Sequence, residues 1–326
     1  MIDRCGRNID YLRVSVTDRC NLRCIYCMPE SGVRLVDRSL ILQEPEIIWI
    51  CRVMAELGIT RIKLTGGEPL VRAGMDRLVY EIEKLPGIQK VTLTTNGILL
   101  RDQMEGLASA GLDGLNISLD TMNAEIFQQI TRRDMMEKTL EGIREAIKYP
   151  SVSVKINCVP LGNEEQDICQ IAMLAREYPV HVRFIEMMPI GYGKIFPGMS
   201  EQQVMEKLTE KFGKLKIYQG PALGNGPCRY YNIDGFQGKI GFISAVSHKF
   251  CSSCNRIRLT SQGYLKTCLQ YTAGRDLREI LRNGGSDQEL EEMIKQALAE
   301  KPDGHKFLEK AREDDTENLC MSQIGG

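Results

Sequence analysis

The fold is decided by Tyr11–Cys27, the stretch YLRVSVTDRCNLRCIYC, in which a β-branched apolar run leads into three closely spaced cysteines. The run Tyr11–Thr17 has the composition of a buried strand. Cys20, Cys24 and Cys27 follow it in the spacing Cys-x3-Cys-x2-Cys. In folds that alternate strands with helices, the loops after the strands carry the chemistry. We therefore expect a site at the carboxyl end of this strand.

Three cysteines on one short loop suit an iron–sulfur cluster. Their thiolates can hold three irons of a four-iron four-sulfur (4Fe-4S) cluster, and no fourth cysteine lies near them in the sequence. One iron then stays open to an outside ligand, such as the amino and carboxylate groups of S-adenosylmethionine (SAM). A zinc site of three cysteines and a distant histidine is the alternative, but structural zinc usually shows paired two-residue spacings. The three-residue gap after Cys20 favours the cluster.

The same alternation continues along the first part of the chain. Apolar, β-branched runs predict six strands, at Tyr11–Thr17, Arg61–Thr65, Lys90–Thr95, Gly114–Asp120, Ser151–Val159 and His181–Glu186. Five segments between them have the apolar spacing of helices: Glu44–Leu57, Met75–Leu85, Arg101–Ala110, Glu137–Tyr149 and Glu165–Tyr178. This order implies parallel strands joined by right-handed crossovers, in either an open doubly wound sheet or an incomplete barrel.

The pattern changes after Met187. A helix is expected at Glu201–Phe212, followed by short strand-like runs around Leu215–Tyr218, Arg229–Asp234 and Lys239–Ile243. The end of the chain is helical and charged.

A second signal, Gly66-Gly67-Glu68-Pro69, comes directly after the second predicted strand. Glycines there allow a backbone to approach a ligand closely, and a Glu beside them can balance an ammonium group. Together with the cysteine motif and the aromatic Tyr26 before its third cysteine, this stretch resembles the radical SAM superfamily. The resemblance implies that SAM binds at the first cluster, with contacts from Tyr26, Gly67, Ser118 and Met188.

A second group of three cysteines, in the spacing Cys-x2-Cys-x13-Cys, is formed by Cys251, Cys254 and Cys268. His248 lies three residues before the first of them, so spacing alone leaves open a zinc site of one His and three Cys or a second iron–sulfur cluster. Arg256 and Arg258 alternate directly after Cys254, and in an extended segment both point to one side. Two guanidinium groups beside an open iron suit a ligand rich in acceptors, such as a nucleotide, and this favours the cluster.

The two cysteine groups together resemble the GTP 3′,8-cyclase (MoaA) family of molybdenum-cofactor biosynthesis. The likeness runs from Tyr11–Ser15 through Phe250–Arg256 to the final Gly-Gly. It implies an α/β fold, with an incomplete (β/α)6 TIM-like barrel of the radical SAM type in residues 1–190. Residues 191–326 would form a C-terminal α+β domain that covers the open side of the barrel and carries a second 4Fe-4S cluster. SAM at the first cluster and GTP at the second would face each other across the barrel.

The resemblance also implies roles for single residues. The ligands of the first cluster are Cys20, Cys24 and Cys27, and those of the second are Cys251, Cys254 and Cys268. Contacts to GTP fall on Arg13, Lys63, Thr94, Lys155, Arg256, Ile257 and Arg258. Catalytic roles fall on the first three cysteines, on Arg256 and Arg258, and on Gly325 and Gly326, because the tail projects into the active site in this family. Lys63 stands where Arg is common, so it keeps the charge but loses the bidentate fork.

The implied reaction begins with reductive cleavage of SAM to a 5′-deoxyadenosyl radical, which removes the 3′ hydrogen of GTP. Bond formation between C3′ and guanine C8 then gives 3′,8-cyclo-7,8-dihydro-GTP. The implied partners are GTP, a low-potential electron donor such as flavodoxin or ferredoxin, and a downstream cyclic pyranopterin monophosphate synthase. The alternatives are another radical SAM enzyme with an auxiliary cluster, such as one that modifies a peptide, and a zinc-binding interaction protein.

Composition and charge limit the kinds of partner and the cellular compartment that we expect for this protein. The 326 residues carry a net charge of −1, which gives no support for binding to nucleic acid or to an anionic membrane. Met1–Asp10 lacks the apolar core of a signal peptide, and no apolar run is long enough to span a bilayer. We expect a cytoplasmic monomer or homodimer. In that compartment the six cysteines of the two groups are expected to be ligands, and the other six of the twelve core or surface thiols.

Overall fold

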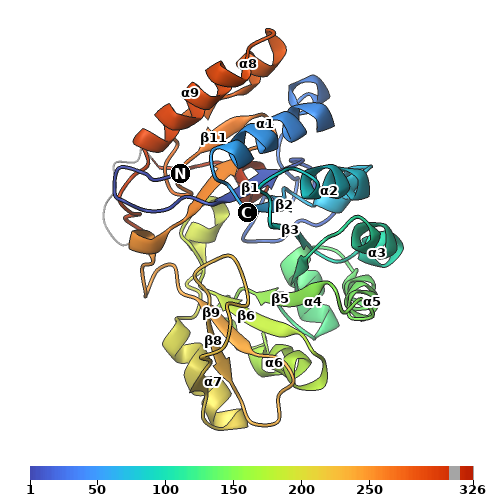
Figure 1. Cartoon of the computed structure of the whole chain (residues 1–326). Coiled ribbons are helices and arrows are strands. Elements are labelled where there is room, and N and C mark those ends of the chain that lie inside the picture. Colours follow the sequence, from blue (N-terminus) through green and yellow to red (C-terminus); the bar gives the residue numbers. More distant parts are fainter. Residues whose placement is uncertain (308–315, 326) are drawn as a thin grey trace.

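The computed structural model describes residues 1–307 and 316–325 and shows parallel strands wrapped by helices (Figure 1). Six strands alternate with the helices of the first part of the chain: β1 (Tyr11–Ser15), β2 (Arg61–Thr65), β3 (Lys90–Thr95), β4 (Gly114–Ser118), β5 (Ser153–Cys158) and β6 (His181–Ile185). Each pairs in parallel with the next one along the chain. A doubly wound sheet would reverse this order at a switch point, so the incomplete barrel is confirmed.

The helices lie on the outside of this sheet (Figure 1). The five predicted helices are present as α1 (Glu44–Glu56), α2 (Met75–Glu83), α3 (Leu100–Ser109), α5 (Met136–Ala146) and α6 (Ile168–Glu177). A further helix, α4 (Ala124–Thr131), was not predicted. It begins at Asn123, whose side chain accepts hydrogen bonds from the backbone N–H groups of Glu125 and Ile126. Short 3-10 turns occur at η1 (Arg38–Leu40) and η2 (Pro69–Val71).

The C-terminal part of the chain adds strands to both edges of the barrel sheet. On the β6 side lie β9 (Ile240–Ile243), β8 (Arg229–Asn232) and β7 (Lys216–Ile217), and on the β1 side lie β10 (Arg256–Leu259), β11 (Tyr264–Lys266) and β12 (Gly274–Asp276). The other elements of the described residues are η3 (Gly191–Ile195), α7 (Glu201–Phe212), η4 (Cys251–Ser253), α8 (Arg278–Arg282), α9 (Asp287–Ala299) and α10 (Met321–Ile324). The division of the chain at residue 190 stays a prediction.

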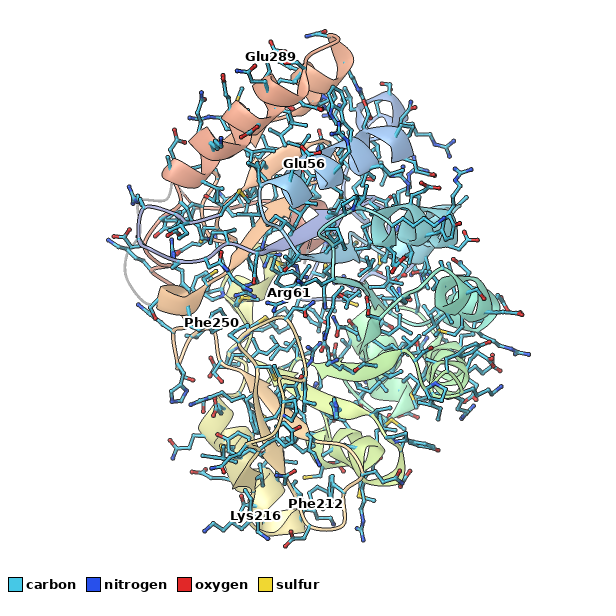
Figure 2. The ribbon with its side chains drawn as sticks, viewed as in Figure 1. Glu56, Arg61, Phe212, Lys216, Phe250 and Glu289 are labelled. Carbon is cyan, nitrogen blue, oxygen red and sulfur yellow. The ribbon has the colours of Figure 1, made fainter. Side chains whose placement is uncertain are left out.

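Alternation along each strand separates the core from the barrel interior. In β2, Ile62 and Leu64 are fully buried in the apolar layer between sheet and helices, so Lys63 and Thr65 point the other way. Figure 2 shows side chains filling this outer layer. None of the described helices combines the length and the apolar character that crossing a bilayer requires.

Candidate functional site

The barrel interior holds a cavity of about 370 Å³. Side chains from β1 to β6 line it, and both groups of cysteines open onto it. The two groups lie at opposite ends for a topological reason. β10 runs parallel to β1, and Cys20–Cys27 follow the carboxyl end of β1, whereas Cys251 and Cys254 precede the amino end of β10.

The first cysteine loop is held by its own backbone and by the end of α4. Within the loop, the N–H groups of Cys27 and Met28 both donate to the carbonyl of Cys24, at 2.9 and 3.1 Å. From outside, the backbone N–H groups of Arg23 and Ile25 donate to carbonyls of residues 131 and 130, at 3.0 and 2.9 Å. The guanidinium of Arg132 donates to the carbonyls of Arg23 and Met28, at 3.0 and 3.1 Å. The loop is therefore fixed on both sides of Cys24.

The three thiols of this loop are buried, so they stay protonated unless a positive centre binds them. Burial raises the pKa of Cys20 to about 11 and that of Cys27 to about 12, and it raises the pKa of Cys24 as well. Buried thiols of this kind lose their protons only to a positive partner, and ligation by metal ions deprotonates a thiol. Glu68 and Asp120, whose charges act on these thiols, are both bound by protein donors. Because both carboxylates are already engaged, the three sulfurs are the groups of this loop that can act as metal ligands.

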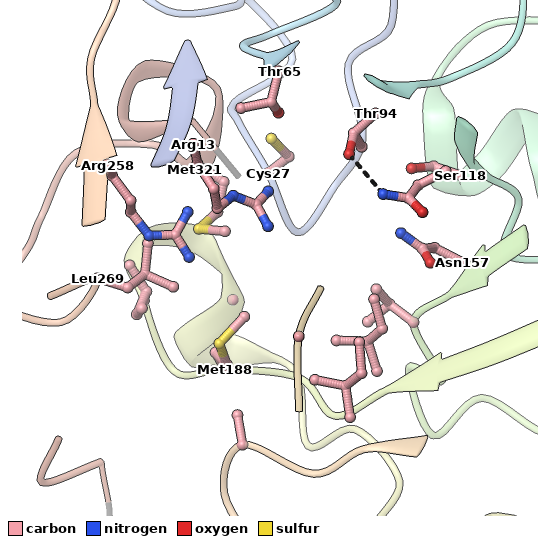
Figure 3. Close-up of a pocket in the computed structure, with 18 of the residues that line it drawn as sticks. Arg13, Cys27, Thr65, Thr94, Ser118, Asn157, Met188, Arg258, Leu269 and Met321 are labelled. Atoms are coloured by element: carbon pink, nitrogen blue, oxygen red, sulfur yellow. Dashed lines mark hydrogen bonds between the residues drawn. The ribbon is translucent and has the colours of Figure 1, made fainter. Parts of the chain in front are cut away.

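The positions expected to contact SAM open onto the same cavity as this loop. Tyr26, Gly67, Ser118 and Met188 all line the cavity, and Figure 3 shows the last two on its walls. Gly67 packs so closely on the cysteine loop that a Cβ there would lie 2.3 Å from the carbonyl oxygen of Arg19, so only glycine fits. The hydroxyl of Tyr26 donates to Asp120 over 2.7 Å, and burial raises the pKa of that carboxyl to about 6.

Glu68 has a structural part in the motif. Its carboxylate accepts from the hydroxyl of Thr95 (2.7 Å) and from the backbone N–H groups of Asn96 (2.6 Å) and Leu70 (3.0 Å). These bonds tie the loop after β2 to the end of β3. Burial raises the pKa of Glu68 to about 7. A carboxylate offers about four lone-pair sites, so most of its acceptor capacity is already used within the protein.

The second cysteine group has basic neighbours. The ammonium of Lys301 donates to the carbonyls of Arg256 (2.9 Å) and Thr267 (2.5 Å) and lies 3.8 Å from the sulfur of Cys254. Burial raises the pKa of Cys254, but the charges of Arg256 and Lys301 outweigh that effect and lower it to about 7. Arg256 lies over the ring of Phe250 at 4.9 Å, a residue labelled in Figure 2. The two basic neighbours therefore favour the thiolate form of Cys254.

His248, the alternative zinc ligand, points elsewhere. Its imidazole is 57% exposed, lies 3.5 Å from Glu201 and lines a shallow depression with Glu201 and Arg229. Moreover, within residues 1–307 and 316–325, no three His, Cys, Asp or Glu side chains converge on a point where one ion would bind. The exposed imidazole of His248 is therefore not placed as a fourth ligand beside the three cysteines.

A row of cations crosses the cavity between the two cysteine groups. Strand register places Arg258 beside Arg13 and Arg13 beside Lys63, so all three share one face. Figure 3 shows the two arginines side by side. Burial, followed by repulsion from neighbouring cations, lowers the pKa of each of the three. Cations forced together in this way create a strong preference for a polyanion.

The other residues expected to contact GTP are placed differently. Thr94 lines the cavity, and its hydroxyl accepts from the amide of Asn116 over 3.3 Å (Figure 3). Lys155 is buried just outside the lining and donates to the hydroxyl of Ser153 over 2.8 Å. Ile257 is fully buried in the apolar core. Its side chain faces away from the cavity because it alternates with the two arginines of β10, so the expected contact is limited to its backbone.

Two cavity residues were missed by the sequence analysis. Arg183 of β6 lines the cavity and donates to Asn157 through its Nε, at 2.9 Å, and Lys301 supports the second cysteine group. Arg183 alternates with Val182 and Phe184, which are buried in the apolar core, and this alternation places its side chain on the opposite, interior face. No motif or spacing in the sequence around Lys301 predicts that it belongs to the site.

The C-terminal tail enters the same space. The guanidinium of Arg258 donates to the carbonyl of Gly325 over 2.7 Å, and Met321 and Ser322 line the cavity. Figure 1 marks this end of the chain beside β1. Gly326 lies outside the described residues.

Comparison with known proteins defines the class first. Residues 14–175 match the radical SAM superfamily. The solved structure of Streptococcus suis SuiB has the same fold, with a TM-score of 0.64 at 16% identity, over 90% of this chain and 66% of that one. The structure of SuiB bound to S-adenosylmethionine has a TM-score of 0.62 at 16% identity, over 96% of this chain and 77% of that one. The chain is a radical SAM enzyme, a class that uses a 4Fe-4S cluster and SAM.

The particular family follows from the rest of the chain. Residues 180–307 match the family Molybdenum Cofactor Synthesis C. The GTP 3′,8-cyclase of Clostridium perfringens (strain 13) is 45% identical over 328 residues, which is all of both chains. Molybdenum cofactor biosynthesis protein 1 of Dictyostelium discoideum is 41% identical over 313 residues, 94% of this chain and 49% of that one. This chain belongs to the GTP 3′,8-cyclase family.

Proposed function

We propose that SAM binds at the first cysteine loop and GTP at the cationic end of the same cavity, where GTP is converted to 3′,8-cyclo-7,8-dihydro-GTP. The observation that carries this placement is the row of buried cations between two cysteine groups that open onto one cavity. The chemistry that a reduced cluster and SAM supply when bound is a 5′-deoxyadenosyl radical able to remove the 3′ hydrogen of GTP.

The protein's part in substrate binding is electrostatic. Arg13, Lys63 and Arg258 repel one another when no anion lies between them, and a triphosphate removes that repulsion while accepting their hydrogen bonds. Arg183 and Lys155 add positive charge at the β5–β6 side of the cavity, because each acts on the pKa of Lys63. The nucleotide is thereby oriented with its phosphates on the strands.

The protein's second part is to position and shield the reacting groups. Strand β1 separates the two cysteine groups, so ligands held at each end meet inside the barrel. Holding donor and acceptor in contact converts a bimolecular step into a unimolecular one. The surrounding helices, the C-terminal strands and the tail exclude water from a radical reaction.

A second 4Fe-4S cluster on Cys251, Cys254 and Cys268 completes the proposal. Its support is the shared cavity, the lowered pKa of Cys254, and the position of His248 away from the three sulfurs. We also propose a cytoplasmic setting, a low-potential donor such as flavodoxin or ferredoxin, and product transfer to cyclic pyranopterin monophosphate synthase.

The test is an anaerobic assay with SAM, GTP and dithionite, followed by mass analysis of the nucleotide and counting of 5′-deoxyadenosine. Reconstituted protein should hold about eight irons. Replacing Cys20, Cys24 and Cys27 by Ala should halve the iron and abolish SAM cleavage. Replacing Cys251, Cys254 and Cys268 should halve the iron and leave some cleavage. One zinc in place of the second cluster would refute the two-cluster claim.

Variants in β10 separate substrate binding from radical generation. Arg256→Ala and Arg258→Ala should weaken GTP binding, because removing one charged partner in such a pocket costs on the order of 2 kcal/mol or more. 5′-Deoxyadenosine should still form in both variants. Wild-type cyclisation in both would remove these arginines from the site.

A further inference from the structure

Ser322 carries a polar group that the fold itself does not satisfy. The residue lies in α10, is 2% exposed and lines the cavity. Among residues 1–307 and 316–325, no partner forms a hydrogen bond with its hydroxyl oxygen. Buried hydroxyls in native proteins are nearly always paired, and an unpaired one costs free energy. A hydroxyl left in this state inside a ligand cavity is suited to bind a ligand.

The contact of Ser322 with Cys27 shows that its hydroxyl lies at the end of the cavity that holds the first cysteine loop. The backbone N–H of Ser322 faces the sulfur of Cys27 and forms a hydrogen bond with it. Figure 3 shows Met321, the preceding residue, close to Cys27 and Arg13. Three residues further on, the carbonyl of Gly325 accepts from Arg258. The tail therefore contacts the first cysteine loop through Ser322 and the cationic row through Gly325.

We propose that the hydroxyl of Ser322 is a binding group of the first site and donates a hydrogen bond to an anionic acceptor bound at the loop of Cys20, Cys24 and Cys27. The acceptor is either a sulfur of the iron–sulfur cluster or the carboxylate of SAM. The inference rests on the proposed placement of the first cluster on these three cysteines. It gives the tail a role on the SAM side of the cavity in addition to its contact on the GTP side.

The tail then links the two sites through a short segment. Once Ser322 is bonded to the occupied first site, the segment from 322 to 325 has one end fixed there and the other fixed on Arg258. Ordering one end lowers the entropic cost of ordering the other. SAM or cluster binding should therefore favour the tail position in which Gly325 meets Arg258.

The test compares Ser322→Ala with a matched tail variant, Gln323→Ala. The side chain of Gln323 accepts from the backbone N–H of Cys320 over 3.1 Å, so this control disturbs the tail without removing the hydroxyl. In metal-free protein, Ser322→Ala should leave the Tm unchanged or slightly higher, because the hydroxyl has no partner to lose. In reconstituted protein, two readouts distinguish the acceptors.

If the acceptor is the SAM carboxylate, Ser322→Ala should weaken SAM binding about tenfold, measured as the SAM-induced change in the EPR spectrum of the reduced cluster. If it is a cluster sulfur, SAM binding should hold and the reduction potential of the first cluster should fall, because hydrogen bonds to sulfur raise that potential. The proposal is overturned if both quantities match those of the wild type and of Gln323→Ala. A wild-type protein without iron on Cys20, Cys24 and Cys27 would instead refute the proposed function.

Discussion

Arg258 donates a hydrogen bond to the carbonyl oxygen of Gly325 over 2.7 Å, and this contact joins a strand of the cationic row to the C-terminal tail. Gly325 has a φ of +73°, and a Cβ there would lie 3.1 Å from Cβ of Ser15 and 3.4 Å from Cγ2 of Thr65. Both its backbone conformation and its tight surroundings therefore require glycine.

We predict that Gly325→Ala, or deletion of Gly325 and Gly326, leaves iron content and SAM cleavage intact but reduces cyclisation by about tenfold or more. A left-handed Ala costs about 1–2 kcal/mol, and the crowding against β1 and β2 adds to that. Product analysis by mass, with 5′-deoxyadenosine counted in the same reactions, measures the split. A synthetic peptide of the last dozen or so residues, added in trans, should restore part of the activity. Full cyclisation in the truncated protein would show that the tail is only a frayed end.

A buried ion pair fixes the start of the tail. Lys266 and Glu317 bond to each other, and their side chains are 2% and 3% exposed. Lys266 also donates to the carbonyl of Tyr271 over 2.6 Å, and Glu317 accepts from the backbone N–H of Leu319 over 2.8 Å. Removing one partner of such a pair leaves the other charge buried, which typically costs about 3–5 kcal/mol.

Lys266→Met or Glu317→Gln should therefore release the tail. We expect faster removal of C-terminal residues by carboxypeptidase and a loss of cyclisation that the peptide in trans partly repairs. The surface pair Lys295–Glu291, whose side chains are 59% and 40% exposed, is the matched control, since exposed pairs contribute little. Unchanged tail protection in both buried-pair variants would contradict the anchoring role.

The sequence could reveal the barrel because its strands are short β-branched runs with glycine, asparagine or cysteine motifs after them. The sequence analysis missed α4 because Ala124–Thr131 is only about two turns long, although Ile126, Phe127 and Ile130 have helical spacing and Asn123 caps the helix. Arg183 was missed because a charged residue within a strand has the same local pattern whether it faces water or a barrel interior. Lys266 and Glu317 lie 51 residues apart, and their pairing depends on the route of the whole chain.

The protonation of Lys155 should make GTP binding depend on pH. Burial, and then the charges of Arg183 and Lys90, lowers the pKa of this ammonium to about 8. Below that pH the group is already charged, and above it a proton must be taken up when an anion binds. GTP affinity should therefore fall as the pH rises above about 8, by up to about tenfold per unit.

Calorimetry of GTP binding between about pH 7 and about pH 9 checks this prediction, with the clusters reconstituted. Lys155→Arg should lose the part of the pH dependence that Lys155 contributes, because a guanidinium stays charged throughout this range, whereas the part due to Lys63, whose pKa is also lowered, should remain. Lys155→Met should bind weakly at every pH. If wild type and Lys155→Arg show the same pH profile, Lys155 does not take part in binding.

Arg132 should control how firmly the first cluster is held. Its φ of +57° is left-handed, and among the described residues no other non-glycine residue has a positive φ. That conformation costs about 1–2 kcal/mol and persists only where the surroundings impose it. Here the guanidinium bonds to the carbonyls of Arg23 and Met28, which flank Cys24 and Cys27.

We predict that Arg132→Gly keeps the backbone conformation, because glycine adopts it without strain, but leaves the cysteine loop without these two bonds. The Tm of the metal-free protein should change little, since relief of strain offsets the lost bonds. Iron release from the first cluster to a chelator should become about tenfold faster, measured by absorbance in a variant that lacks Cys251, Cys254 and Cys268. Arg133→Ala is the control, because Arg133 is adjacent and its guanidinium donates only to the carbonyl of Arg132 within the described part of the chain, over 2.7 Å. Equal rates of iron release in Arg132→Gly and Arg133→Ala would show that the loop does not need Arg132, and that its left-handed backbone serves the end of α4 alone.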